Sequence, residues 1–482
     1  MRFWPLLLAA VLACQTRSEK RADRNDAAPA PAAAVRPLGW LAVGAGGVPG
    51  DYQISIAQDL GLARAVLPGP GKVLFGSGPG ASVARARETA PSGDALVQAL
   101  GELLAPRAGR QDEFVPAPLS IDLPAEPKLL EVELQRQLSV PTSAPLVLWV
   151  AGHGENQSLA MWPQTQLLAG QLVSWLQAKK AGRSVAVVLT TCFSGSFDSM
   201  VFQAGDPKRG PSRATQCGLF ASTHDLPADG CDPNPDRRKQ EGYGIHALNA
   251  LRRRDRAGRL DPSIDSDGDG RISLLEAHSR ARIVSQSANV PTTTSERYLR
   301  EVARKVGKGA KVELPEERAV IAGLARRLGL PAADLATLGV RAETELRGFE
   351  SRIAALAKDF QAAKLVEDST YKQAAGELLA RWPVLDDPWH PAYQATLARE
   401  RAAIQEHLAR SSSYSANRRA VLRVSELDAA QWKLRTEAAP WENLVRAVRT
   451  LRLAETLAAR GGPQWKHYRA LLQCERAVPR AP

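Results

Sequence analysis

The sequence predicts an α/β region followed by an all-α region, and two observations predict it. Through about residue 294, short continuous apolar runs alternate with stretches that suit helices. From about Ser295 onward those runs stop, and Ala, Leu, Arg and Glu dominate. Continuous apolar runs are typical of strands buried on both faces of a parallel sheet. Strand–helix alternation then builds a sheet with helices on both faces.

Five apolar runs of the first region, each ending in small or polar residues, are expected to be strands. They are Trp40–Val43, Lys72–Phe75, Pro145–Ala151, Ser184–Thr191 and Cys217–Ser222. The stretches between them are expected to be helices that cover the sheet. These are Tyr52–Val66, Gly93–Leu104, Pro127–Leu138 and Gln164–Ala181.

The second region, 295–482, is expected to be a helical domain built as a bundle or as an array of hairpins. Its expected helices are Pro315–Leu328, Pro331–Leu356, Tyr371–Trp382, Pro391–Arg410, Ala416–Ala438 and Trp441–Arg460.

The charge of the chain and its distribution bear on which binding partners are expected. The chain of 482 residues has 63 Lys and Arg against 51 Asp and Glu, a net charge of +12. Residues 291–482 hold 32 of the basic and 23 of the acidic residues. Arginines there are interleaved with glutamates at helical spacing, as on solvated helix faces, and no nucleic-acid-binding motif is present. We therefore expect no nucleic acid partner. A protein partner of the helical domain, or binding to an acidic envelope component or membrane headgroups, stays open.

The N-terminus indicates export. Arg2 precedes an apolar run, Phe3–Ala13, which ends at Cys14. A positive start, a short apolar core and small residues at its end are the parts of a secretory signal, here 1–14. The ending Leu-Ala-Cys resembles a bacterial lipobox, which implies a lipid anchor on Cys14 and a periplasmic or outer-membrane-anchored lipoprotein. The alternative is a cleaved signal in which Cys14 is incidental. Residues 15–37, rich in charge, Ala and Pro, are expected to form a tether.

Two chemically active side chains follow expected strands. His153 lies between two glycines after one strand, and Cys192 ends the next. In open α/β sheets, ligands bind beyond the carboxyl ends of the strands. A neighbouring imidazole can activate a thiol there, and the amides of Gly154 and Cys192 could hold an oxyanion. The alternative is a buried structural cysteine beside an ordinary loop.

The segments Val-Ala-Gly-His153-Gly and Leu-Thr-Thr-Cys192-Phe-Ser-Gly-Ser-Phe resemble the legumain-like and caspase-like cysteine peptidases. The resemblance covers about Leu38 to Val290. It implies a caspase/hemoglobinase fold over 38–294, with a catalytic His and Cys at the ends of neighbouring strands. The chain departs from legumain before Cys192, where Thr-Thr replaces an acidic-Ala pair, and it lacks the Asp-Ser-Cys of metacaspases.

A second candidate site is a twelve-residue segment, 265–276, that matches the EF-hand calcium loop position by position. Its expected ligands are Asp265, Asp267, Asp269, Arg271 through its carbonyl, Ser273 and Glu276. Three aspartates within five residues repel one another unless a cation neutralises them. No second such loop pairs with it, so a structural Ca²⁺ is expected. The alternative is an Asp/Gly turn without metal.

Two further expectations concern the loop after the last expected strand. A disulfide between Cys217 and Cys231 suits an exported protein, and the alternative is one buried and one exposed thiol. In the resembled fold this loop borders the pocket for the side chain before the scissile bond. Asp225 and Asp229 would then favour Arg or Lys there. The rivals are the Asn preference of legumains, two solvated aspartates, or Asp229 capping the turn before Cys231.

We therefore expect an exported cysteine endopeptidase that cleaves protein or peptide substrates. Its basic runs Lys208-Arg209, Arg237-Arg238-Lys239 and Arg252-Arg253-Arg254 would be candidate self-cleavage sites. The alternative is a non-catalytic interaction lipoprotein that keeps the peptidase fold as a binding module.

Overall fold

The computed structural model describes residues 37–87, 93–104, 112–178, 183–213, 215–331 and 334–479. The predicted signal, Cys14 and all of the tether up to residue 36 lie outside these residues. Residues 37–482 form one compact unit.

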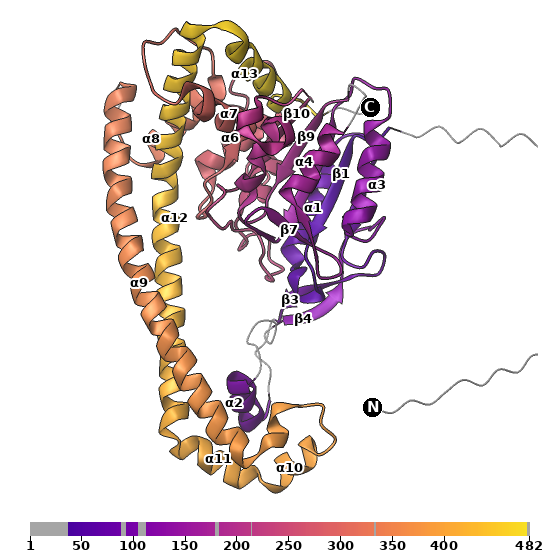
Figure 1. Cartoon of the computed structure of the whole chain (residues 1–482), viewed down its shortest axis with the longest axis vertical. Helices are drawn as coiled ribbons and strands as arrows, with labels where there is room; N and C mark the ends of the chain where they lie inside the picture. Colours follow the sequence, from indigo (N-terminus) through magenta and orange to yellow (C-terminus); the bar gives the residue numbers. More distant parts are fainter. Residues whose placement is uncertain are drawn as a thin grey trace, which may run out of the picture. The chain divides into compact units, whose positions relative to one another are not determined.

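A six-stranded sheet lies between the helices of the upper right part of Figure 1. Its strand order is β11-β10-β9-β5-β1-β2, and every neighbouring pair is parallel except β10 with β11. The bounds are β1 (Trp40–Ala45), β2 (Gly71–Phe75), β5 (Leu146–Gly152), β9 (Val185–Leu189), β10 (Gln216–Phe220) and β11 (Thr292–Thr293). The prediction of a parallel α/β sheet is confirmed, and β11 is an antiparallel edge strand that the sequence pattern missed.

Alternate side chains of each strand point into two separate cores. Trp149 of β5 lies in the core under α1 (Ile54–Val66), α5 (Tyr243–Leu251) and α6 (Leu274–Val284). Its neighbour Leu148 lies in the core under α3 (Pro127–Leu138) and α4 (Ala169–Gln177). Because both faces are covered, the strands are apolar at successive positions. Helices on both faces of the sheet are thus confirmed.

Smaller sheets flank the central one. β3 (Ser82–Ala86) pairs with β4 (Asp112–Pro116), and β6 (Gly154–Glu155), β7 (Ser158–Met161) and β8 (Thr165–Leu168) form a three-stranded meander after His153. The expected helix Gln164–Ala181 is therefore wrong at its start, where β8 precedes α4. Short 3-10 helices are η1 (Pro49–Asp51), η2 (Ser194–Val201), η3 (Gln203–Gly205), η4 (Pro207–Arg209), η5 (Pro262–Ile264) and η6 (Pro383–Asp386).

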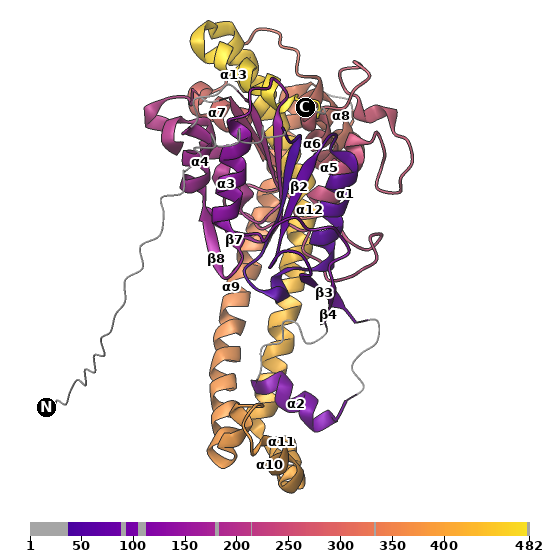
Figure 2. The ribbon, with the colours of Figure 1, turned by 90° about the vertical axis from the view of Figure 1, so that its right-hand side faces the viewer.

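Two long antiparallel helices dominate the C-terminal region (Figures 1 and 2). α9 (Leu335–Arg381) has 47 residues and α12 (Ser412–Arg460) has 49. Each was expected as two helices. In α12 the helix continues through Pro440, which costs one backbone hydrogen bond but does not end it. The remaining helices are α7 (Thr294–Ala303), α8 (Pro315–Arg327), α10 (Tyr393–Arg399), α11 (Arg401–Arg410) and α13 (Gly462–Glu475).

The core continues across the expected boundary at residue 294. Leu219 of β10 and Leu451 of α12 belong to the same buried cluster. A disulfide joins Cys217 of β10 to Cys474 of α13, and Cys231 is a free thiol. The expected Cys217–Cys231 bond is therefore wrong. Cys217 is buried in the sheet beneath α13, whereas Cys231 follows a loop that leads towards α1.

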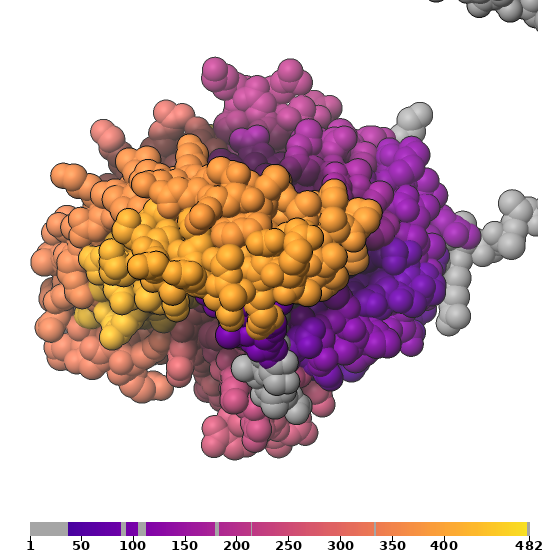
Figure 3. Space-filling model, turned by 90° about the horizontal axis from the view of Figure 1, so that it is seen from below, coloured from indigo at the N-terminus to yellow at the C-terminus, as the bar shows by residue number. Residues whose placement is uncertain are grey.

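Helix α2 (Ala95–Leu104) corrects another expectation, because it does not cover the sheet. Leu96, Leu100 and Leu103 pack with the end of the α9–α12 hairpin, in a cluster that includes Leu378 and Ile404. Figure 3, viewed from that end, shows residues of α2 against the orange tip. The apolar face of α2 is buried as expected, but the sequence pattern does not predict the surface on which it packs.

Candidate functional site

The sheet register places His153 and Cys192 at equivalent positions on neighbouring strands. Val150 of β5 pairs with Leu189 of β9 in the parallel ladder. His153 and Cys192 each lie three residues further along, beyond the carboxyl ends of their strands. This is the juxtaposition that the sequence pattern predicted. Parallel register alone produces it, because both strands end at the same edge of the sheet.

The His153 ring is half-buried and held by a residue that sequence analysis did not single out. Its Nε2 lies 2.8 Å from Oε1 of Gln53. The side-chain Nε2 of Gln53 in turn donates to the backbone carbonyl of Gly50 at 3.1 Å. Burial lowers the pKa of His153, while the charge and backbone of Asp51 act in the opposite direction. The imidazole is thus oriented and favours its neutral form.

The Cys192 thiol is enclosed by the loop that follows β10. Its Sγ lies 3.4 Å from the carbonyl oxygen of Ala228, and the Ala228 amide donates to Sγ at 3.2 Å. The Phe193 amide donates to the Leu226 carbonyl, so the two segments run against each other. Burial raises the pKa of Cys192, and nearby Asp229 raises it further. Within the described residues, no hydrogen bond joins Cys192 to His153.

Gly154 and Cys192, the two residues whose amides are expected to hold an oxyanion, lie against each other. A Cβ built on Gly154 would lie 2.7 Å from the carbonyl oxygen of Cys192, so only glycine fits there. The Ala160 amide donates to the His153 carbonyl. Because hydrogen-bonded and non-hydrogen-bonded pairs alternate along an antiparallel ladder, the next pair, Gly154 with Leu159, is a non-hydrogen-bonded one. The ladder therefore leaves the Gly154 amide unused. In the described part of the chain, the Cys192 amide also donates to no carbonyl oxygen.

Asp225 and Asp229 have different surroundings. The Asp225 side chain is 65% exposed and lies on the rim of two cavities beside α12. Asp229 is half-buried, and its Oδ2 accepts the Ala288 amide at 3.0 Å. Burial raises the pKa of Asp229, and a hydrogen bond from Trp432 of α12 lowers it. Of the pair, Asp229 is the one whose charge reaches Cys192.

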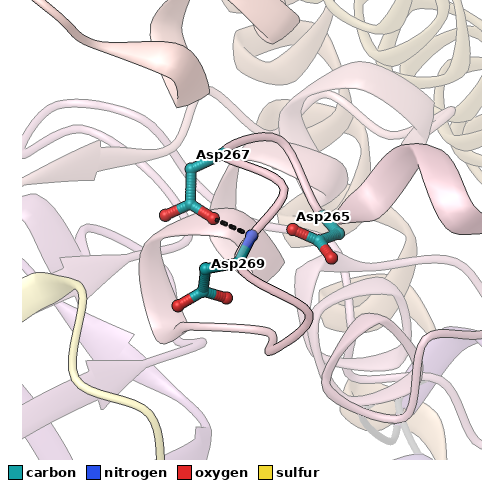
Figure 4. Close-up of side chains that lie close together, drawn as sticks. All are labelled: Asp265, Asp267 and Asp269. Atoms are coloured by element: carbon teal, nitrogen blue, oxygen red, sulfur yellow. Dashed lines mark hydrogen bonds between the residues drawn. The ribbon is translucent and has the colours of Figure 1, made fainter.

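The three aspartates of the predicted calcium loop come together, as the sequence predicts. One carboxylate oxygen from each of Asp265, Asp267 and Asp269 lies within 4.8 Å of the others. Figure 4 shows the three side chains around one turn of the loop. Asp265 is 8% exposed at its side chain, and its Oδ1 is buried without a hydrogen-bond partner. A buried carboxylate oxygen without a partner is costly, and a hard cation would supply one.

The other expected ligands are arranged differently. Glu276 lies outside the group of three aspartates. Its Oε1 accepts the Ser266 amide at 2.8 Å, and its Oε2 accepts the Ser273 amide at 2.9 Å. The Ser273 hydroxyl caps α6 by accepting the Glu276 amide. Ser273 and Glu276 therefore form a capping box in this structure. The one other predicted ligand, besides the three aspartates, is the backbone carbonyl of Arg271.

No known protein-family model matches this chain, and no curated protein matches it. Among the described residues, no helix is both long enough and apolar enough to cross a membrane.

Proposed function

We propose that this chain is a cysteine endopeptidase of the caspase/legumain-like type, with Cys192 as nucleophile and His153 as its base. The matched register of β5 and β9, which brings both residues to one edge of the sheet, is the observation that carries the proposal. The Gly154 amide, which makes no hydrogen bond within its strand pair, supports it further.

The chemistry follows from these groups. His153 takes the proton of Cys192 as sulfur attacks the peptide carbonyl carbon, and the carbonyl oxygen becomes an oxyanion held by the two amides. The C–N bond then breaks, and His153 gives the proton to the leaving amine. Water attacks the resulting thioester, which releases the acid and restores the thiol. Burial raises the pKa of the thiol, so a base such as His153 is needed to take its proton.

The loop around Ala228 determines access to the sulfur. Ala228 contacts Sγ through both its amide and its carbonyl, so a substrate must displace this segment or compete with it. Asp229 follows directly and is the better candidate for binding a basic side chain before the scissile bond. Fluorogenic peptides that differ only at that position test this. Cleavage after Asn or Asp but not after Arg or Lys would overturn the basic preference.

We place the enzyme outside the cytoplasm, as a lipid-anchored bacterial protein with a structural Ca²⁺. The Cys217–Cys474 disulfide supports export, since such bonds persist in oxidising compartments. The Asp265 Oδ1 atom without a partner supports the cation. The Asp-rich loop would supply carboxylate ligands, and the ion would hold the start of α6 against the core.

A non-catalytic binding module is the second candidate, and the enclosure of the thiol favours it. A raised thiol pKa and two contacts to Ala228 also suit a buried cysteine with no reaction to perform.

Labelling with a peptidyl acyloxymethyl ketone separates the two candidates. The enzyme should be labelled at Cys192, and both Cys192→Ala and His153→Ala should abolish labelling. Cys231→Ala is the matched control, because Cys231 is the other free thiol of the described chain and should leave labelling intact. Labelling that survives His153→Ala would indicate a thiol without a catalytic base.

A further inference from the structure

Two basic runs that are separate in the sequence meet on one surface. Arg237-Arg238-Lys239 precedes α5 and Arg252-Arg253-Arg254 follows it. Between them and α6 lies a cavity of about 440 Å³. Six guanidinium groups line it, those of Arg237, Arg238, Arg254, Arg256, Arg259 and Arg280. Only two carboxylates line it, those of Glu241 and Asp255.

Three of the arginines form the framework of the cavity. Arg237 pairs with the buried carboxylate of Asp59 at 2.6 Å. Arg256 pairs with Glu241 and donates to backbone carbonyls of the first basic run. Arg280 pairs with Asp261. These ion pairs fix the guanidinium groups in place before any ligand arrives, which lowers the entropy cost of binding.

The other three arginines of the lining are held less firmly. The side chains of Arg238 and Arg259 are 90% and 81% exposed, and each pairs only with a carboxylate near it in the sequence. Arg254 makes no ion pair with any residue that the structure describes, and its Nη1 donates to the Gly258 carbonyl. Exposed pairs of this kind are weak and exchange readily for a better anion.

Residues 232–261 carry eight Lys and Arg against five Asp and Glu. Of the six arginines that line the cavity, five pair with one carboxylate each, so the positive excess of the lining comes from Arg254. One guanidinium group is enough to bind a single carboxylate through two parallel hydrogen bonds. Several guanidinium groups around one space can bind an anion that has several charged oxygens. The volume lies in the lower part of the range for small-ligand sites. His246 offers nothing further, since its Nε2 is bonded to Glu241 at 2.6 Å.

We infer that this cavity binds a compact polyanion carrying phosphate groups, either a soluble phosphate compound or the phosphate headgroup of a lipid. The site does not depend on the proposed peptidase activity. It also gives the two basic runs a role other than self-cleavage, because Arg237 and Arg253, one from each run, are anchored by ion pairs rather than held out in a free loop.

Titration calorimetry of the full chain with inorganic pyrophosphate tests the inference. The wild type should bind, and the double variant Arg254→Gln/Arg259→Gln should lose about tenfold or more in affinity. The matched control, Arg341→Gln/Arg419→Gln, removes the same charge from exposed positions on α9 and α12 and should bind like the wild type. Equal weakening in both double variants would show non-specific attraction and overturn the site, as would absence of binding by the wild type.

Vesicles distinguish the two sources of phosphate. Flotation with phosphatidylcholine vesicles containing phosphatidic acid, compared with phosphatidylcholine alone, should recover the wild type but not the cavity variant if the ligand is a headgroup. Binding of pyrophosphate with no difference between the two vesicles assigns the site to a soluble compound.

Discussion

Gln53 holds His153 by a hydrogen bond of 2.8 Å between Oε1 and Nε2 at the end of β5. Gln53 is itself fixed by its bond to Gly50, so its oxygen faces the ring. Such an acceptor orients the imidazole, and it stabilises the imidazolium that forms when His153 takes a proton.

Replacing Gln53 should therefore impair catalysis without removing either reacting group. Gln53→Ala should lower kcat by no more than about a hundredfold, the low end of what loss of a general base costs, because the base itself remains. It should also lower the pKa of His153, because the imidazolium loses an acceptor, and move the acid limb of the pH–rate profile to lower pH. Gln53→Glu should move that limb to higher pH. Gln373→Ala, on the exposed face of α9, is the control. A Gln53→Ala profile that overlays the wild type would remove Gln53 from the mechanism.

Calcium should stabilise the protein through the aspartate loop. Binding to the folded state adds RT ln(1 + [L]/Kd), roughly 2.7 kcal/mol at a hundredfold excess over Kd. The Tm of the full chain should rise with Ca²⁺, and Asp267→Asn should remove most of the rise. Glu276→Ala is the less specific variant, because it also removes the cap of α6.

The control for the calcium measurement is Asp359→Asn, an exposed aspartate of α9. It should keep the full calcium response. Identical melting curves in Ca²⁺ and in chelator would show that the three aspartates hold no ion.

The Cys217–Cys474 disulfide should contribute to stability because it closes a long loop. The two residues are 257 positions apart, and bonds of this type typically contribute about 2–5 kcal/mol by restricting the unfolded chain. Cys474→Ser should therefore lower the urea midpoint by a corresponding amount. Under reductant, the wild type and the variant should unfold together. A difference that persists under reductant would mean that the substitution acts through packing instead.

Glu475 should make stability depend on pH. Burial raises its pKa to about 7, and its Oε1 accepts from Thr294 Oγ1 and the Ser295 amide, each at 2.7 Å. The folded state therefore keeps a proton that the unfolded state loses, and this site's contribution to stability falls between about pH 4.5 and pH 7. Glu475→Gln should remove this loss of stability, because glutamine cannot ionise. At pH 8 the variant should be more stable than the wild type by on the order of 3 kcal/mol.

Urea unfolding at pH 5 and pH 8 measures that difference. Glu343→Gln, on the exposed surface of α9, should change neither value. If the free energies of unfolding of the wild type and Glu475→Gln differ by the same amount at both pH values, Glu475 does not titrate in this range.

The sequence predicted those parts of the molecule that depend on local pattern. Each strand of the parallel sheet is an apolar run, and the positions of His153 and Cys192 follow from where two of those runs end. The three aspartates of the loop are close in the sequence and had to be close in space. These features need no knowledge of distant contacts.

What the sequence could not supply are pairings between distant segments. Cys217 bonds to Cys474 because α13 lies on β10, and nothing near either residue indicates this. Leu96 packs on the α9–α12 hairpin for the same reason. Gln53 follows a short 3-10 helix after β1 and bears no local mark of its role. Only its distance from His153 reveals it.

Hydrolysis by the two dyad variants tests the central claim most directly. Turnover of a fluorogenic peptide library by the full chain should be measurable for the wild type, and Cys192→Ala and His153→Ala should each abolish it while their circular dichroism and Tm stay near wild type. Near-wild-type turnover by either well-folded variant would contradict the assignment of catalysis to this edge of the sheet.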